Sequence, residues 1–155
     1  MLSTKHKIKL AGYIYILIKI YYKIFKKKID IYNLDISRNN INWSLDLSEG
    51  IDLSIFIFGN SEKKLSRLKN LLPSKKKYFF IDVGSNIGST SLFLAKNFKD
   101  SKIISIEPTF YAYNKFLKNL ELNPVLKKQI VPVNNLVSSK QINREIYSSW
   151  KVTKS

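Results

Sequence analysis

Residues 78–133 alternate short apolar runs with longer helical patterns, and this alternation constrains the fold more than any other feature of the chain. The apolar runs predict strands over residues 78–83, 103–106 and 129–133, and the helical periodicity predicts helices over about 87–98 and 110–122. Connections long enough to hold a helix join parallel strands. We therefore expect an α/β domain with a doubly wound parallel sheet, whose first strand is buried on both faces.

The connection after the first predicted strand combines an acid with two glycines. Asp82 lies at the end of the strand, and Gly84, Ser85, Asn86 and Gly88 follow before the helix. Gly84 permits a tight turn because it has no Cβ atom. Backbone N–H groups of such a loop, and of the helix N-terminus behind it, can bind the polar groups of a ligand. We expect these five residues to surround a cofactor.

A second acid follows the second predicted strand. Glu107 lies 19 residues after Gly88, directly behind the apolar run at 103–106. A carboxylate at this position can accept hydrogen bonds from both ribose hydroxyls of an adenosine cofactor. It could also be an exposed acid that the dipole of the following helix favours. The glycine loop upstream, at a suitable distance, favours the ribose role.

The spacing of the glycines discriminates between adenosine cofactors. A dinucleotide-binding loop has glycine at its first, third and sixth positions. Counted from Gly84, these positions hold Gly84, Asn86 and Ser89, so the third glycine is missing and an NAD-binding oxidoreductase is disfavoured. The pattern Asp-x-Gly-x-Asn-x-Gly instead resembles the first motif of S-adenosylmethionine-dependent methyltransferases. In those enzymes the acid and the loop hold the methionine part of the cofactor.

Three longer stretches extend this resemblance: DVGSNIG, SIEPTFYAYNKFLKNLELNP and IVPVNNLVSS. Together they closely resemble the FkbM family of methyltransferases. WSLDLSEGIDLSIFIFG upstream and IYSSW at 146–150 resemble one branch of that family, so the resemblance covers roughly residues 41–150. It implies a Rossmann-like methyltransferase fold, S-adenosylmethionine as cofactor, and O-methylation of a hydroxyl on a sugar, a glycan or a related small molecule. It also implies that Asn135 and Leu136 lie near the adenine. Ser85 and Leu136 stand where the family usually has alanine.

The regular pattern fades after residue 138, so we expect the parallel sheet to be truncated after its third strand. No residue is identifiable as a catalytic base, and Asn114, Asn119 and Asn123 are interpreted as surface polar residues. The alternative function is a truncated, catalytically inactive remnant that binds the cofactor. A strand over residues 78–83 without a fourth-strand neighbour would have an open apolar edge, which favours self-association.

The N-terminal segment, residues 1–30, has a pattern of its own. Residues 1–28 contain eight lysines and no acid, and residues 8–28 predict a basic amphipathic helix. At 100° per residue one sector of this helix holds Lys5, Lys9, Lys19, Lys23, Lys26 and Lys27. The pattern fits peripheral contact with a membrane, or packing on the protein's own core or a second subunit. No signal-peptide cleavage site follows, so we expect a cytoplasmic protein with membrane contact, if any, at the inner face.

The remaining predictions concern the segment between these two parts and the bulk composition. Alternating residues predict a β-hairpin over 41–58, followed by a helix from about 61 to 72. Residues 41–155 then form one partial methyltransferase domain, with its cofactor-binding unit at 78–138. The chain has no cysteine and one histidine, so no metal site is expected. The chain has 27 basic and 11 acidic residues. Only three of the basic residues are arginines, which favours compositional bias over a nucleic-acid interface as the cause of the positive charge.

Overall fold

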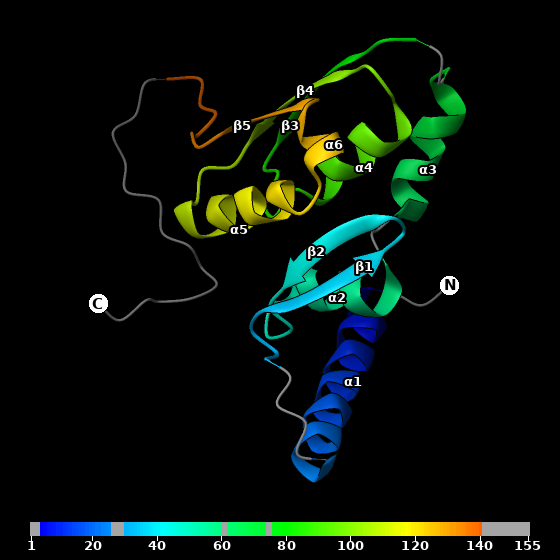
Figure 1. The fold of residues 1–155 in the computed structure, drawn as a ribbon, viewed down its shortest axis with the longest axis vertical. Coiled ribbons are helices and arrows are strands. Elements are labelled where there is room, and N and C mark those ends of the chain that lie inside the picture. Colours follow the sequence, from blue (N-terminus) through cyan, green and yellow to red (C-terminus); the bar gives the residue numbers. More distant parts are fainter. Residues whose placement is uncertain (1–3, 26–29, 60–61, 74–75, 141–155) are drawn as a thin grey trace. The chain divides into compact units, whose positions relative to one another are not determined.

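The structure is a computed structural model that describes residues 4–25, 30–59, 62–73 and 76–140. The chain forms two compact units, Met1–Ser61 and Glu62–Ser155. The elements of the first unit are α1 (Thr4–Phe25), β1 (Leu34–Arg38), β2 (Ile41–Leu45) and α2 (Gly50–Phe58). The elements of the second unit are α3 (Glu62–Leu71), β3 (Phe79–Val83), α4 (Ser89–Asn97), β4 (Lys102–Ile106), α5 (Phe110–Glu121), α6 (Pro124–Lys127) and β5 (Ile130–Val133) (Figure 1).

The first unit contains a hairpin, but not the one predicted over residues 41–58. β1 pairs antiparallel with β2 through a two-residue turn, in which Asn39 and Asn40 both have positive φ, 53° and 52°. Such a turn matches the right-handed twist of the two strands, and asparagine tolerates this conformation better than most residues. The hairpin therefore spans Leu34–Leu45, one strand earlier than predicted.

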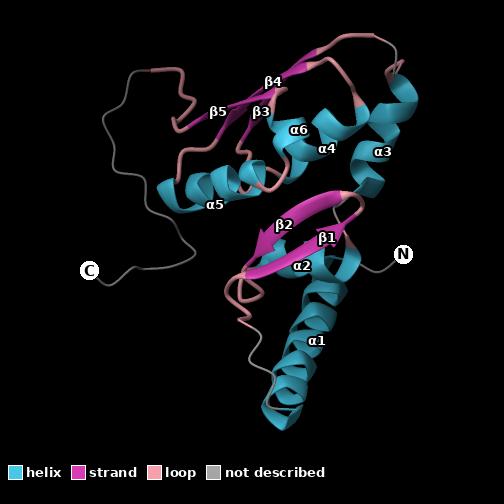
Figure 2. Cartoon of the chain, in the orientation of Figure 1, coloured by secondary structure: helices cyan, strands magenta, loops and turns pink. Residues whose placement is uncertain are grey.

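The predicted second strand of that hairpin is wrong, because Gly50–Phe58 forms the helix α2 (Figure 2). Its alternating sequence fits a strand, but a helix places Asp52 and Ile55 one turn apart, and both are buried together with Leu53. The Asp52 carboxylate accepts a hydrogen bond of 2.7 Å from the backbone N–H of Asp46, at the end of β2. Burial in the tertiary structure and this local hydrogen bond thus favour a helix over a strand for these residues.

The second unit contains the parallel sheet expected from residues 78–133. Its three strands have the order β3-β4-β5, and Asp82 aligns with Ser105 and Val83 with Ile106. The predicted strands and helices of this region occur within one or two residues of their expected bounds. The predicted helix after residue 61 is α3. This α/β arrangement confirms the Rossmann-like fold class, with three parallel strands among the described residues.

Among the residues that the structure describes, helices cover one face of this sheet. Helices α4, α5 and α6 lie along the same side of the strands (Figure 1). Ile103, Ser105 and Ile130 are buried, whereas Phe79, Ile81, Val83 and Val131, which alternate with them and so lie on the opposite face, are 55–61% exposed. Successive right-handed crossovers in one direction place their helices on the same face, which explains the asymmetry. The prediction that the first strand is buried on both faces is therefore wrong for the described residues.

The covered face holds the hydrophobic core of the second unit. Leu92, Phe98, Ile103, Phe116 and Leu120 have no exposed surface. The Phe98 ring packs against the rings of Tyr78 and Phe80, with centroid separations of 5.5 and 5.3 Å. Burial of these apolar side chains supplies most of the free energy that holds the crossover helices on the strands. The core thereby sets the positions of the loops at the carboxyl ends of the strands.

Candidate functional site

Three loops meet at the carboxyl ends of β3, β4 and β5, and backbone hydrogen bonds join them. The N–H groups of Gly84 and Ser85 both donate to the carbonyl of Ile106, at 2.8 and 3.0 Å. The N–H of Glu107 donates to the carbonyl of Val133 at 3.0 Å. Ligands of open parallel sheets bind outside this edge. The sequence-predicted residues Asp82, Gly84, Ser85, Asn86, Gly88, Glu107, Asn135 and Leu136 all belong to these strand ends and loops.

Glu107 connects the first two loops. Its Oε2 atom accepts a hydrogen bond from the backbone N–H of Asn86 at 2.9 Å. Its Oε1 atom accepts from the N–H of Thr109 at 2.9 Å and from the Thr109 hydroxyl at 2.5 Å. The residue is only 5% exposed, so it is not the exposed acid considered as the alternative. A carboxylate offers about four acceptor positions, and the three donors here leave one for a further hydrogen bond.

The glycine loop has an open side and a closed side. Gly84 has φ 78°, and a Cβ atom added to it would meet no atom within 4 Å. Gly88 has φ 86°, and an added Cβ would lie 2.1 Å from the Phe116 ring of α5. Gly84 therefore leaves room beside the loop, whereas Gly88 allows the loop to pack closely on α5. The spacing of the motif alone does not distinguish these two roles.

The Ser85 side chain is a buried polar group without a hydrogen-bond partner. The residue is 4% exposed, and its hydroxyl oxygen has no partner among the described residues. Neighbouring Asn86 has φ 49°, and its side-chain oxygen accepts from the N–H of Ile87 at 2.8 Å. A buried hydroxyl that forms no hydrogen bond costs about 1–3 kcal/mol. A ligand at this loop could supply the missing partner.

Asp82 lies at the end of β3 and points toward α4 on the covered face of the sheet. Its Oδ2 atom accepts a hydrogen bond of 2.6 Å from the Ser91 hydroxyl, and the hydroxyls of Ser91 and Ser105 lie 2.7 Å apart. Burial raises the pKa of the Asp82 carboxyl; the Ser91 hydrogen bonds oppose this effect, and the negative charge of Glu107 adds to it. Ser91, which lies outside the motif, thus holds the Asp82 carboxylate, and Ser105 contacts Ser91 in turn.

Further residues that position the loops also escaped the sequence analysis. The Asn134 side chain donates to the carbonyl of Glu107 at 2.8 Å, so it joins the ends of β4 and β5. Asn119 is fully buried and donates to the carbonyl of Ile87 at 3.0 Å, and Asn123 is 6% exposed. The interpretation of Asn119 and Asn123 as surface residues is therefore wrong, whereas Asn114 is exposed as expected. Helical spacing could have distinguished them, because on a helix over residues 110–122 Asn119 and Asn123 lie on the side of Phe116, whereas Asn114 lies on the opposite side.

The third loop is less enclosed. Asn135 and Leu136 follow β5 and are both exposed, and the Asn135 side-chain oxygen accepts from the N–H of Leu136 at 2.8 Å. Exposure of Leu136 is 43%. These residues form a rim beside the loops held by Glu107. The Leu136 side chain is therefore exposed beside these loops.

The fold defines a Rossmann-like α/β unit, a class in which ligands bind at the carboxyl ends of the parallel strands. No family model matches the chain. Over 55 residues it is 38% identical to the methyltransferase sdnD of Sordaria araneosa, a match that covers 36% of this chain and 20% of that protein.

Solved structures of similar fold include TYW2 of Pyrococcus horikoshii in complex with MeSAdo, with a TM-score of 0.56 and 19% identity over 82% of this chain and 49% of that one. TYW2 of M. jannaschii in complex with AdoMet gives a TM-score of 0.50 and 18% identity over 67% of this chain and 43% of that one. At these identities the likeness establishes the fold. The chain spans at most about half the length of each of these proteins.

Proposed function

We propose that this chain binds S-adenosylmethionine at the carboxyl ends of β3, β4 and β5 and supplies the cofactor-binding part of a methyltransferase. The observation that carries the proposal is the arrangement around Glu107, a buried carboxylate that joins the glycine loop to the start of α5. The matched stretch of a methyltransferase and the fold shared with an AdoMet complex support the same cofactor.

Two features of the loop fit such a cofactor. The space beside Gly84 would admit the polar end of a ligand against the backbone. The Ser85 hydroxyl would gain a partner that the protein does not provide among the described residues. In this arrangement Asp82, Gly84, Ser85 and Asn86 bind the methionine end, while Gly88 sets the position of the loop.

Glu107 would bind the ribose. With one acceptor position left, it can take one hydroxyl directly, and a second requires that one present donor, such as the Thr109 hydroxyl, be released. Asn135 and Leu136 would border the adenine, with Leu136 offering apolar contact.

The finer proposal concerns the acceptor. The resemblance of DVGSNIG and SIEPTFYAYNKFLKNLELNP to the FkbM family favours a hydroxyl of a sugar, a glycan or a related small molecule. The bound cofactor would supply the electrophilic methyl group, and the acceptor oxygen must approach it in line at about 3–3.5 Å. The described residues hold the cofactor end of that geometry, and no base for the acceptor is assigned.

Isothermal titration of the 155-residue chain tests the proposal. S-adenosylmethionine should bind, and NAD should bind more weakly, because the loop lacks the third glycine of a dinucleotide site. Absence of S-adenosylmethionine binding by a folded chain, or tighter binding of NAD, would refute it. Transfer of a labelled methyl group to glycan hydroxyls would support the finer proposal, whereas binding without transfer to any hydroxyl acceptor would favour the inactive cofactor-binding alternative.

A further inference from the structure

Helix α1 has more apolar surface than its own unit covers. The helix contacts α2, and Ile14, Tyr15 and Ile18 are half-buried on one side of it. Self-packing, one of the two roles expected from the sequence, therefore accounts for one sector of the helix. The other apolar sector remains exposed in the structure.

This exposed sector is a continuous stripe of large apolar side chains. Its members follow the alternating three- and four-residue spacing that keeps one face of a helix in line. Their exposures are 40% for Leu10, 66% for Tyr13, 63% for Leu17, 48% for Ile20 and 66% for Ile24. Contiguous exposed apolar surface of this kind marks a contact site for a partner or a membrane.

Lysines border the stripe along one side. At 100° per residue Lys9 and Lys23 lie next to it, and Lys19 lies further round, with its Nζ atom 4.7 Å from the centroid of the Tyr15 ring. All three are exposed. The sequence of residues 1–28 contains eight lysines and no acid. The partner of this surface must therefore combine an apolar layer with negative charge.

That charge pattern decides between two occupants of the stripe. A second copy of α1 would bring lysines against lysines, and the helix offers no acid to pair with them. An anionic bilayer offers acyl chains below phosphate headgroups, which matches an apolar stripe bordered by lysines. Within the described residues no helix has the length and apolarity needed to cross a membrane. The geometry thus fits a helix that lies in the interface.

We propose that α1 is an interfacial anchor that binds the surface of an anionic lipid bilayer. The stripe Leu10, Tyr13, Leu17, Ile20 and Ile24 enters the boundary between headgroups and acyl chains, while Lys9 and Lys23 contact the phosphates. This proposal does not depend on the cofactor site. A methyltransferase anchored in this way would act on acceptors at or near a membrane.

Flotation with vesicles tests the anchor on the whole chain, because aggregates stay at the bottom of the gradient and only lipid-bound protein rises. The wild-type chain should float with vesicles of 70% phosphatidylcholine and 30% phosphatidylserine, and much less with pure phosphatidylcholine. Salt at 1 M should release most of it, since the screening length then falls to about 3 Å. Equal flotation on neutral and anionic vesicles, or none on either, would overturn the proposal.

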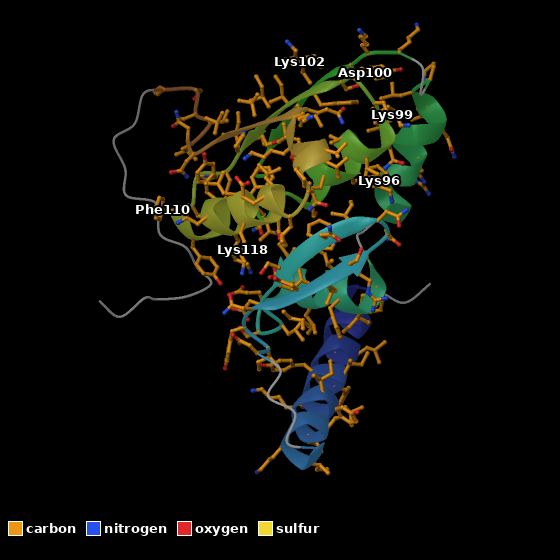
Figure 3. The ribbon with its side chains drawn as sticks, viewed as in Figure 1. Lys96, Lys99, Asp100, Lys102, Phe110 and Lys118 are labelled. Atoms are coloured by element: carbon orange, nitrogen blue, oxygen red, sulfur yellow. The ribbon has the colours of Figure 1, made fainter. Side chains whose placement is uncertain are left out.

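Two triple variants distinguish a specific contribution of the α1 lysines to vesicle binding from an effect of the net positive charge of the chain. Lys9→Gln, Lys19→Gln and Lys23→Gln together should lower the partition coefficient on anionic vesicles by at least about tenfold. The matched control removes three exposed lysines of the second unit, Lys99→Gln, Lys102→Gln and Lys118→Gln, and should change it by less than about threefold (Figure 3). An equal loss in both triple variants would mean that net charge, not α1, drives the contact.

The apolar stripe has its own test. Leu17→Ser with Ile20→Ser should abolish flotation without lowering the melting temperature, because both side chains are exposed. In addition, lipids brominated near the headgroup should quench the emission of a Leu17→Trp variant more than that of the wild type. If the double serine variant instead turns a lipid-free dimer into a monomer and vesicles never bind, the stripe is a subunit interface and the proposal is wrong.

Discussion

Glu107 forms the densest set of polar contacts at the candidate site, and its role can be separated from that of its neighbours. Glu107→Gln should weaken S-adenosylmethionine binding by about 1–3 kcal/mol, because hydrogen bonds to a charged acceptor are lost. Thr109→Val removes one donor to Oε1 and should leave the affinity equal or tighter, if that donor competes with the ribose. Titration calorimetry measures both variants.

A matched control for Glu107 lies on α5. Glu121 is an exposed acid that pairs with Lys127 at 2.6 Å, so Glu121→Gln changes the same charge away from the loops. It should leave the affinity unchanged. Equal affinities for the Glu107→Gln variant and the wild type would remove Glu107 from the cofactor site and leave it the structural role of joining the loops.

Asp82 couples the site to pH. Because burial raises the pKa of its carboxyl, the folded state binds the proton more tightly than the unfolded state does. The contribution of Asp82 to stability is therefore best at low pH and falls as the pH rises from the usual carboxyl range through the raised pKa. Asp82→Asn keeps an acceptor for Ser91 and should show a melting temperature at pH 7 equal to or above that of the wild type.

The pH profile of the difference between the two proteins checks this prediction. The advantage of the asparagine variant should grow as the pH rises from 4 to 7 and then level off. A variant that becomes less stable than the wild type over the same interval would contradict the sign of the raised pKa. A loss of cofactor affinity at unchanged stability would instead place Asp82 in direct contact with the ligand.

At the scale of elements, the packing of α5 on the glycine loop depends on one missing Cβ atom. Gly88→Ala combines a left-handed φ of 86° with a contact of 2.1 Å to Phe116, so it should cost about 2–5 kcal/mol. Gly84→Ala has a similar φ of 78° but open space, so backbone strain alone should cost about 1–2 kcal/mol. Urea unfolding followed by circular dichroism measures both.

The contact with Phe116 can be tested by a double-mutant cycle. Phe116→Leu removes ring atoms where the added methyl group would lie, so it should destabilise the Gly88→Ala background less than it destabilises the wild type. Additive effects would show that backbone strain, rather than the ring, makes glycine necessary at position 88. Gly84→Ala should show no coupling with Phe116→Leu.

At the scale of the whole molecule, the uncovered sheet face predicts self-association. Phe79, Ile81 and Val83 are about 60% exposed, and β3 pairs only with β4 among the described residues. An apolar strand with an unpaired backbone edge is a template for pairing with a second copy of the chain. Light scattering after size-exclusion chromatography should show association that increases with protein concentration.

One charged residue on that strand should suppress the association. Ile81→Lys places a charge on both the open face and the edge strand, as natural proteins do to protect their edges. Leu71→Lys, at an α3 residue that is 77% exposed, is the matched control and should not change the association. A wild-type chain that is monomeric at all concentrations, with cooperative melting, would contradict the prediction.

The sequence predicted the second unit better than the first for a physical reason. In 78–133 each strand is a short apolar run and each helix has its own periodicity, so local and tertiary preferences agree. In 50–58 the alternation of Ile51, Asp52 and Leu53 fits a strand, yet burial of Asp52 and Ile55 on one side selects a helix. Where a sequence fits a strand and a helix equally well, the surface against which it packs decides between them.

The candidate site shows the same division. The residue types in Asp82–Gly88 and Glu107 indicate ligand chemistry because glycine and carboxylate have few substitutes at such positions. By contrast, common polar residues carry no such signal in sequence. Ser91 and Ser105 support Asp82 from the neighbouring helix and strand, and Asn134 supports Glu107 from 27 residues further along the chain. Asn119 differs from these, since its helical spacing from Phe116 places it on the buried face of α5, opposite Asn114, and only its hydrogen bond to Ile87 required the tertiary structure.

The sequence by itself determined the succession of strands and helices in the second unit, the loop chemistry at their ends and the amphipathic character of α1. These are local properties, set by side-chain periodicity, turn residues and charge spacing. Only the tertiary structure decided that Glu107 is buried between two loops, that Gly88 rather than Gly84 meets α5, and that one face of the sheet and one face of α1 remain exposed. These depend on contacts between residues far apart in the chain, which a local pattern does not encode.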